Sequence, residues 1–216
     1  MCGRLNLYDS SVISELMDSL GLPSFPELTP RYNLPPTSRL NVVTRANELV
    51  LMTWGIEFGA FRHPNTKVDT ALRKPRLTRM LTEQRCLVPV NRIYEWPDPK
   101  THPEYKGIKT RFCIHTPLDV LFLGGIYKEH PEYGAQFNVL TTDPTIAINK
   151  FHHRSPVIIA PEHAHTWLRA GDLDDITPLL NPYPGTLLIY ECDAYVDNAR
   201  HEGPQCMQPR VTDPPL

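Results

Sequence analysis

Apolar residues fall in short runs along this chain, and their spacing predicts many strands and few helices. Residues 10–20 carry apolar side chains at helical spacing, which predicts a helix with Ser10 or Ser11 as its N-cap and Gly21 at its end. Residues 23–36 are dense in proline and predict an ordered loop that leads into the first strand.

Runs rich in β-branched and aromatic residues predict the strands. They cover residues 39–44, 48–54, 85–96, 111–115, 121–127, 136–142 and 186–190. Asn47 belongs to the turn between the first two, and Gly124 and Gly125 allow another backbone to approach closely. A loop from Asn65 is expected to pass into a helix after Pro75, and another short helix is expected at residues 161–170.

This order of elements indicates an α+β fold. We expect a single domain over residues 1–216, built mostly from antiparallel β-sheet with a barrel-like core and a few peripheral helices. The chain holds 23 prolines and no low-complexity repeat, so its loops are expected to be long but fixed. No composition shift divides the chain.

Composition narrows the functional class. The 41% hydrophobic and 21% charged content is that of a soluble globular protein, and no apolar run reaches the length of a membrane span. A cytoplasmic protein with no membrane contact is therefore expected. The five cysteines form no CxxC pair, which argues against a disulfide framework or a zinc site. Cys86, Cys113 and Cys192 lie in apolar runs and are expected to be inert core thiols, and no metal or cofactor is expected.

Charge is distributed unevenly, although the net charge is only −2. Residues 62–92 hold eight Lys or Arg against two acids, whereas residues 172–216 hold two basic residues against eight acids. The basic stretch could follow a phosphate backbone, or it could be an ordinary solvated helix surface. The chain ends in an acidic, proline-rich tail from about residue 200.

The first residues, Met1-Cys2-Gly3-Arg4, carry the most distinctive chemistry. Removal of Met1 would leave Cys2 with an α-amine and a thiol on adjacent carbons, whose reference pKa values are about 7.7–8.0 and about 8.5. Such a 1,2-aminothiol condenses with an aldehyde through the amine and closes a thiazolidine ring through the thiol. The alternative is that Cys2 is a small buried apolar residue.

Two further sites could carry protons. Glu95 lies between Tyr94 and Trp96, and partial burial among aromatic rings would raise its pKa toward the range of a general acid. A Glu facing water at a sheet edge is the alternative. His152 and His153 suit proton transfer near neutral pH, but neighbouring side chains on a strand point in opposite directions, so one of them should enter a given site.

Aromatic residues accompany the basic stretch. Trp54, Phe58 and Phe61 stand just before it, and rings interleaved with cations such as Arg73 and Arg76 are typical of single-stranded nucleic acid binding. Core packing is the alternative, above all for Trp54. At the head of the stretch, Asn65 could hold a substrate oxygen.

Six motifs in order resemble those of the SRAP family, whose members process abasic sites and crosslink to single-stranded DNA. The resemblance is strongest over residues 1–160. The motifs are MCGR at residues 1–4, RYNLPPT at 31–37, WG at 54–55, NTKVDT at 65–70, YEW at 94–96 and HHRSP at 152–156.

This resemblance implies an SRAP-like fold and a role for each matched residue. It makes Cys2 the nucleophile, makes Asn65, Glu95 and His152 active-site residues, and places further residues along the DNA and active-site cleft: Arg4, Asn33, Lys67, Thr141 and Arg154. Four departures are visible, one of them Ser155, which stands where Met or Arg is commoner. Lys67 replaces the usual Arg and loses its planar fork, and Asp69 replaces Glu. The loop after Trp54 lacks the family's P-x-W, so Phe58 and Phe61 are candidates for the aromatic wedge.

The implied function is abasic-site processing through a thiazolidine crosslink between Cys2 and a ring-opened abasic sugar. Lyase, crosslink-reversal and Met1-removing peptidase activities would accompany it. The expected partner is single-stranded DNA with abasic sites, with ss–dsDNA junctions as a further candidate, bound by a monomer near replication forks in the nucleoid. Two alternatives remain, an N-terminal-nucleophile amidohydrolase such as a glutamine amidotransferase, and a non-catalytic single-strand DNA module.

Overall fold

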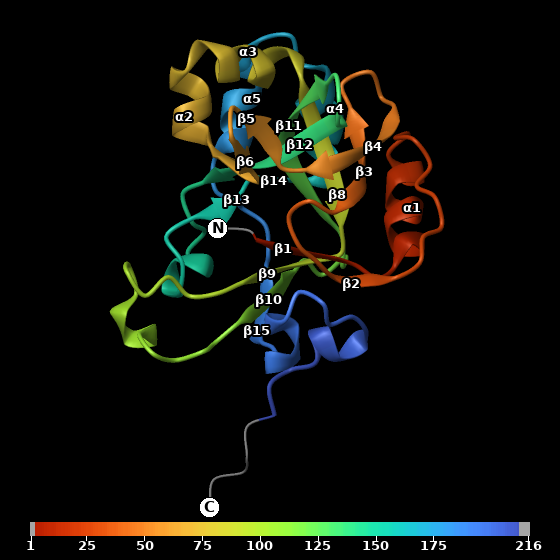
Figure 1. Cartoon of the computed structure of the whole chain (residues 1–216). Coiled ribbons are helices and arrows are strands. Elements are labelled where there is room, and N and C mark those ends of the chain that lie inside the picture. The colour runs from red at the N-terminus through yellow and green to blue at the C-terminus, as the bar shows by residue number, and fades with distance from the viewer. Residues whose placement is uncertain (1–2, 212–216) are drawn as a thin grey trace, which may run out of the picture.

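A closed β-barrel forms the centre of the computed structural model, which describes residues 3–211 (Figure 1). Within these residues five strands pair in a ring, in the order β12–β4–β3–β8–β11 and back to β12. Their bounds are β3 Arg39–Thr44, β4 Leu49–Trp54, β8 Arg85–Val90, β11 Leu121–His130 and β12 Gly134–Thr142. The β4–β12 pair is parallel and the others are antiparallel. The predicted barrel-like core is therefore confirmed.

A second, antiparallel sheet lies below the barrel in Figure 1 and has the strand order β15-β10-β9-β1-β2. Its strands are β1 Arg4–Leu7, β2 Arg31–Leu34, β9 Arg92–Glu95, β10 Phe112–His115 and β15 Leu188–Glu191. Strand β2 lies inside the stretch predicted as a loop, so that prediction was wrong at its end. Pairing with β1 makes residues 31–34 extended despite the prolines on either side.

The predicted single strand at residues 85–96 is divided at Asn91 between the two sheets. The buried side chain of Asn91 accepts from the backbone N–H groups of Tyr8 and Asp9 and donates to the carbonyls of Asp9 and Asp119. All the polar atoms of this side chain are thereby used, which stabilises the point where the chain leaves the barrel. Glu95 reaches the second sheet through this change of direction.

Short strands lie beside the barrel: β7, β13 and β14 extend its sheet, and β5 and β6 form a separate two-stranded sheet. They are β5 Ile56–Phe58, β6 Phe61–His63, β7 Asn65–Lys67, β13 Ser155–Pro156 and β14 Ile158–Ile159. Strands β5 and β6 form a hairpin, whereas β7 pairs in parallel with β12 and β13 pairs in antiparallel with β12.

Helices cover the outside, with α2 and α3 at the top of Figure 1 and α1 at the right. Their bounds are α1 Ser10–Ser19, α2 Val68–Arg73, α3 Pro75–Glu83, α4 Ala164–Arg169 and α5 Leu173–Ile176. The N-cap of α1 is Asp9, not Ser10 or Ser11, because its carboxylate accepts from the N–H groups of Ser11 and Val12. The loop predicted from Asn65 instead contains β7 and α2.

The C-terminal segment packs against the second sheet. Its residue Cys206 joins Tyr94, Cys113, Cys192 and Val196 in a small buried cluster, so the segment from about residue 200 forms part of the body as far as residue 211. Cys86, Cys113 and Cys192 are fully buried, and burial raises the pKa of each thiol, as expected of inert core cysteines. Among residues 3–211, no helix is long and apolar enough to cross a membrane.

Gly125 provides a test of the barrel. A Cβ there would lie 2.7 Å from the carbonyl oxygen of Asn138 and 3.0 Å from the sulfur of Cys86, as the predicted close approach requires. We expect Gly125→Ala to lower the free energy of unfolding by about 2–3 kcal/mol, measured by urea denaturation. Gly171→Ala is the matched control, because its Cβ would meet nothing within 4 Å. Equal stability of the two variants would contradict this account.

Candidate active site and nucleic-acid interface

Glu95 and His152 come together where the second sheet meets the barrel. Glu95 ends β9, and His152 stands three residues before β13. The Nε2 atom of His152 lies 3.8 Å from Oε1 of Glu95, and both side chains are about 95% buried. Burial raises the pKa of Glu95 and lowers the pKa of His152 to about 4. The imidazole is therefore neutral at pH 7, and the carboxyl binds a proton more readily than an exposed Glu.

Backbone contacts fix the tautomer of His152. The N–H of Arg154 points at Nδ1 over 3.0 Å, so Nδ1 accepts and the neutral ring carries its proton on Nε2, toward Glu95. The carbonyl of Arg154 lies 3.1 Å from the same nitrogen, but Nδ1 cannot donate to it while accepting. The Nε2–H of His152 therefore points toward the Glu95 carboxyl, and the 3.8 Å between the two atoms is longer than a direct hydrogen bond.

Arg154 links the pair to the barrel end. Its guanidinium donates to the carbonyl of Thr141 over 2.5 Å and lies 3.2 Å from Asp143 and 3.7 Å from Asp69. Strand β7 pairs with β12, and this pairing places Lys67 beside Thr141 and Asn65 beside Val139. Asn65, Lys67, Thr141 and Arg154 are thus carried by three neighbouring strands or the segment leading into them.

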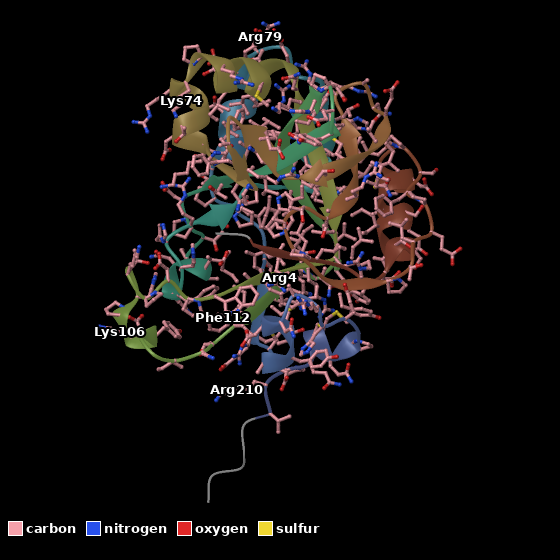
Figure 2. The ribbon with its side chains drawn as sticks, in the orientation of Figure 1. Arg4, Lys74, Arg79, Lys106, Phe112 and Arg210 are labelled. Atoms are coloured by element: carbon pink, nitrogen blue, oxygen red, sulfur yellow. The ribbon has the colours of Figure 1, made fainter. Side chains whose placement is uncertain are left out.

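Arg4 lies on β1, the strand that pairs with the one carrying Glu95. Strand β1 sets Arg4 opposite Tyr94, so the chain direction carries residue 3 toward Glu95. The Arg4 guanidinium donates to Oδ1 of Asn33 over 2.7 Å and lies over the ring of Trp96, 5.5 Å from its centroid. Figure 2 shows Arg4 between the barrel and the C-terminal segment. Cys2, the expected nucleophile, lies outside the described residues.

A hollow of about 420 Å³ opens beside Asn65. Phe58 forms one wall, with the guanidinium of Arg76 5.0 Å from the centroid of its ring. The hollow is also lined by His63, Thr66, Lys67, Thr70, Lys74 and Leu77. Figure 2 shows Lys74 extending outward near the top of the molecule. Aromatic and cationic side chains in one concave place suit a base and its phosphate.

Phe61 occupies the β5–β6 hairpin and is 73% exposed, the opposite of a core position. Arg73, in contrast, lies on α2 with its Nε bonded to the carbonyl of Asp69. Phe58, Lys67 and Arg76 therefore line the hollow, whereas Phe61 and Arg73 lie outside its lining. All five side chains are at least partly exposed, and one expected aromatic residue is an exception.

Trp54 is that exception, because its side chain is fully buried. It packs in the barrel core and donates from its indole N–H to the carbonyl of Pro64 over 2.9 Å. The expectation that Trp54 contacts DNA is corrected accordingly: the ring supports the residue before Asn65 from inside. Asn33 and Thr141 are also fully buried, so neither side chain forms an exposed wall of the cleft.

No sequence pattern pointed to Asp98. Its carboxylate lies 3.0 Å from Nδ1 of His153, and the His153 ring stacks on His152 at a centroid distance of 4.8 Å. Asp98, His152 and His153 offer three possible metal ligand atoms within 4.8 Å of one another. A tetrahedral zinc ion needs its ligand atoms about 3.4 Å apart. Nδ1 of His152 already accepts from the Arg154 N–H, so this atom is not available as a zinc ligand.

Comparison with known proteins decides the family. The sequence model of the family described as SOS response associated peptidase (SRAP) matches residues 1–199. The chain belongs to the SRAP family.

The relatives differ in how much of their own length this chain covers. The abasic site processing protein YoaM of Bacillus subtilis is 26% identical, with 96% of this chain and 97% of YoaM covered. The abasic site processing protein HMCES of Xenopus tropicalis is 24% identical over 82% of this chain and 65% of its own length. A crystal structure of a Bacteroides thetaiotaomicron protein, 19% identical, superposes with a TM-score of 0.77 and covers 96% of this chain and 100% of that one.

The buried His152 makes the stability of this SRAP protein depend on pH. Its folded-state pKa of about 4 is below the reference value of 6.5, so the unfolded chain binds more protons between these values. The stabilisation is complete above pH 6.5 and is lost as pH falls toward 4, by up to about 3 kcal/mol.

We expect His152→Gln, which does not titrate, to flatten this part of the stability curve in urea denaturation at pH 4.5–7. His153→Gln is the matched control, because His153 is 39% exposed. The account fails if the two variants depend on pH in the same way.

Proposed function

We propose that this protein processes abasic sites in single-stranded DNA by forming a covalent thiazolidine crosslink through Cys2. The observation that carries the proposal is the buried Glu95–His152 pair beside the strand that begins at Arg4. Membership of the SRAP family supports it, as do the names of the relatives. The same membership favours it over a glutamine amidotransferase or a non-catalytic DNA module.

The chemistry balances with water as the one by-product. Glu95, with its raised pKa, gives a proton to the ring oxygen while the C1′ hydroxyl loses its proton to water, so the sugar opens to its aldehyde, and the Nε2–H of His152 stabilises the Glu95 carboxylate that remains. The Cys2 amine attacks C1′ and water leaves, which gives an imine. The Cys2 sulfur then adds to the imine carbon, the nitrogen takes the thiol proton, and the thiazolidine is complete. Asn65 holds a sugar hydroxyl.

Other outcomes start from the same imine. Loss of a C2′ proton and of the 3′ phosphate cleaves the strand, which is the lyase activity. Proton transfer through His152 back to the adduct reverses the crosslink. Met1 must be removed before any of these steps, and a peptidase activity of this protein on its own N-terminus would supply that removal.

The DNA strand is proposed to run across the Glu95–His152 pair between two hollows. One is the hollow at Phe58, and the other, of about 500 Å³, is lined by Trp96, Tyr105 and Ile108. Lys67, Lys74 and Arg76 would contact phosphates. We propose that the protein does this as a monomer at replication forks in the nucleoid, where single strands or ss–dsDNA junctions are exposed.

A denaturing gel tests the function. Mixing the protein with an oligonucleotide that bears one abasic site should give an SDS-stable shifted band, and an analogue without the aldehyde should give none. Cys2→Ala should abolish the band, and Glu95→Gln should slow its formation by about 10²-fold. A band of equal strength in Cys2→Ala would end the proposal, as would an active preparation in which mass spectrometry finds Met1 retained.

The exposed ring of Phe61 is proposed to stack on a DNA base. Phe61→Ala should weaken binding of single-stranded DNA by about 1–3 kcal/mol, measured by fluorescence anisotropy. Leu118→Ala is the matched control, because Leu118 is 56% exposed beside a different hollow and should leave affinity unchanged. Equal affinities of the two variants would exclude stacking by Phe61.

A further inference from the structure

The C-terminal segment crosses the second sheet from one edge to the other. Strand β15 forms one edge and β2 the other, and residues 192–207, called here the C-terminal clamp, connect them on one face. At the far edge, Glu202 of the clamp accepts from the N–H of Tyr32 over 2.7 Å and from Nε of Arg31 over 2.9 Å. The clamp thereby satisfies part of the free edge of β2.

Asn33 connects the clamp to Arg4. Its fully buried side-chain amide donates to the carbonyls of Val196, Asn198 and His201, over 3.2, 2.9 and 3.1 Å. Its oxygen accepts from Arg4, which also donates to Val196 over 3.4 Å. Every polar atom of the Asn33 side chain is hydrogen-bonded within the protein. The side chain therefore holds the clamp and leaves no polar atom for a ligand.

The clamp also holds the residues on both sides of Glu95. Tyr94 packs among Cys192, Val196 and Cys206 of the clamp. Trp96 donates from its indole N–H to Asp197 over 2.9 Å, and Arg111 holds that carboxylate in place with two further hydrogen bonds. Successive residues on a strand face opposite sides, so Glu95, between Tyr94 and Trp96, points away from the clamp and toward His152.

We infer that the C-terminal clamp is the positioning element of the active site, and that Asn33 and Asp197 are positioning residues rather than DNA contacts. The clamp packs against one face of β1 and β9 and thereby fixes the positions of Arg4 and Glu95. The family match ends at residue 199, so the clamp contacts made by His201, Glu202 and Cys206 lie beyond it. The expected effect on the crosslinking rate rests on the proposed function, whereas the expected effect on the solvent exposure of Trp96 does not.

The rate test separates positioning from DNA contact. In Asn33→Ala, the maximum crosslinking rate at saturating abasic DNA should fall by about tenfold, while affinity for the aldehyde-free analogue stays unchanged. A variant that is merely less stable would lose crosslinked fraction, not rate constant. Glu191→Gln, which removes a carboxylate paired with Arg210 at the end of β15, is the matched control with an expected wild-type rate. Weaker analogue binding at an unchanged maximum rate would overturn the inference.

A second readout needs no crosslinking. Of the three tryptophans, Trp54 and Trp167 are fully buried, so acrylamide quenching reports on Trp96. Quenching should increase in Asn33→Ala as Arg4 and Asp197 release the ring, and unchanged quenching would overturn the inference. Should Asn33→Ala fail to fold, Glu202→Ala at the exposed edge decides the matter by the same two measurements. If the wild-type protein forms no crosslink, the proposed function is wrong, and acrylamide quenching of Trp96 alone tests whether the clamp positions this residue.

Discussion

Burial of two titratable side chains against each other is the constraint on which this structure depends. A carboxyl and an imidazole can lose their water only where surrounding elements supply both enclosure and hydrogen-bond partners. Here the second sheet provides Glu95 and the barrel end provides His152, with Arg154 fixing the ring by its backbone N–H. Neither layer alone would bury the pair, so the junction of the two layers is the site.

Several features of the chain exist to keep that junction in place. Asn91 turns one apolar run from the barrel into the second sheet and satisfies four backbone groups as it does so. Trp54 supports the peptide before Asn65 from within the core. The barrel thus fixes one side of the site from inside, whereas the second sheet is held from its opposite face by the segment after β15.

Local patterns predicted the elements well where side chains alternate, as at residues 39–44, and where apolar residues keep helical spacing, as in α1. They failed where a contact distant in sequence decides the outcome. The strand at Arg31–Leu34 forms because β1 lies beside it, and proline content gave the opposite indication. For the site, the motifs indicated Glu95 and His152. No local pattern predicted that Asp98 contacts His153, or that the buried Asn33 amide donates to three backbone carbonyls.

Burial also separates two kinds of polar residue that a motif cannot distinguish. Asn33 and Thr141 have no exposed surface, so an interaction with DNA would require the surrounding packing to open. Phe61 has most of its ring exposed, and Arg76 lies over Phe58 at the edge of a hollow. The first group, Asn33 and Thr141, loses its water when the protein folds. The second group, Phe61 and Arg76, would lose it only when a ligand binds. Residues of the second group can therefore exchange water for a ligand, and the first group determines where that exchange takes place.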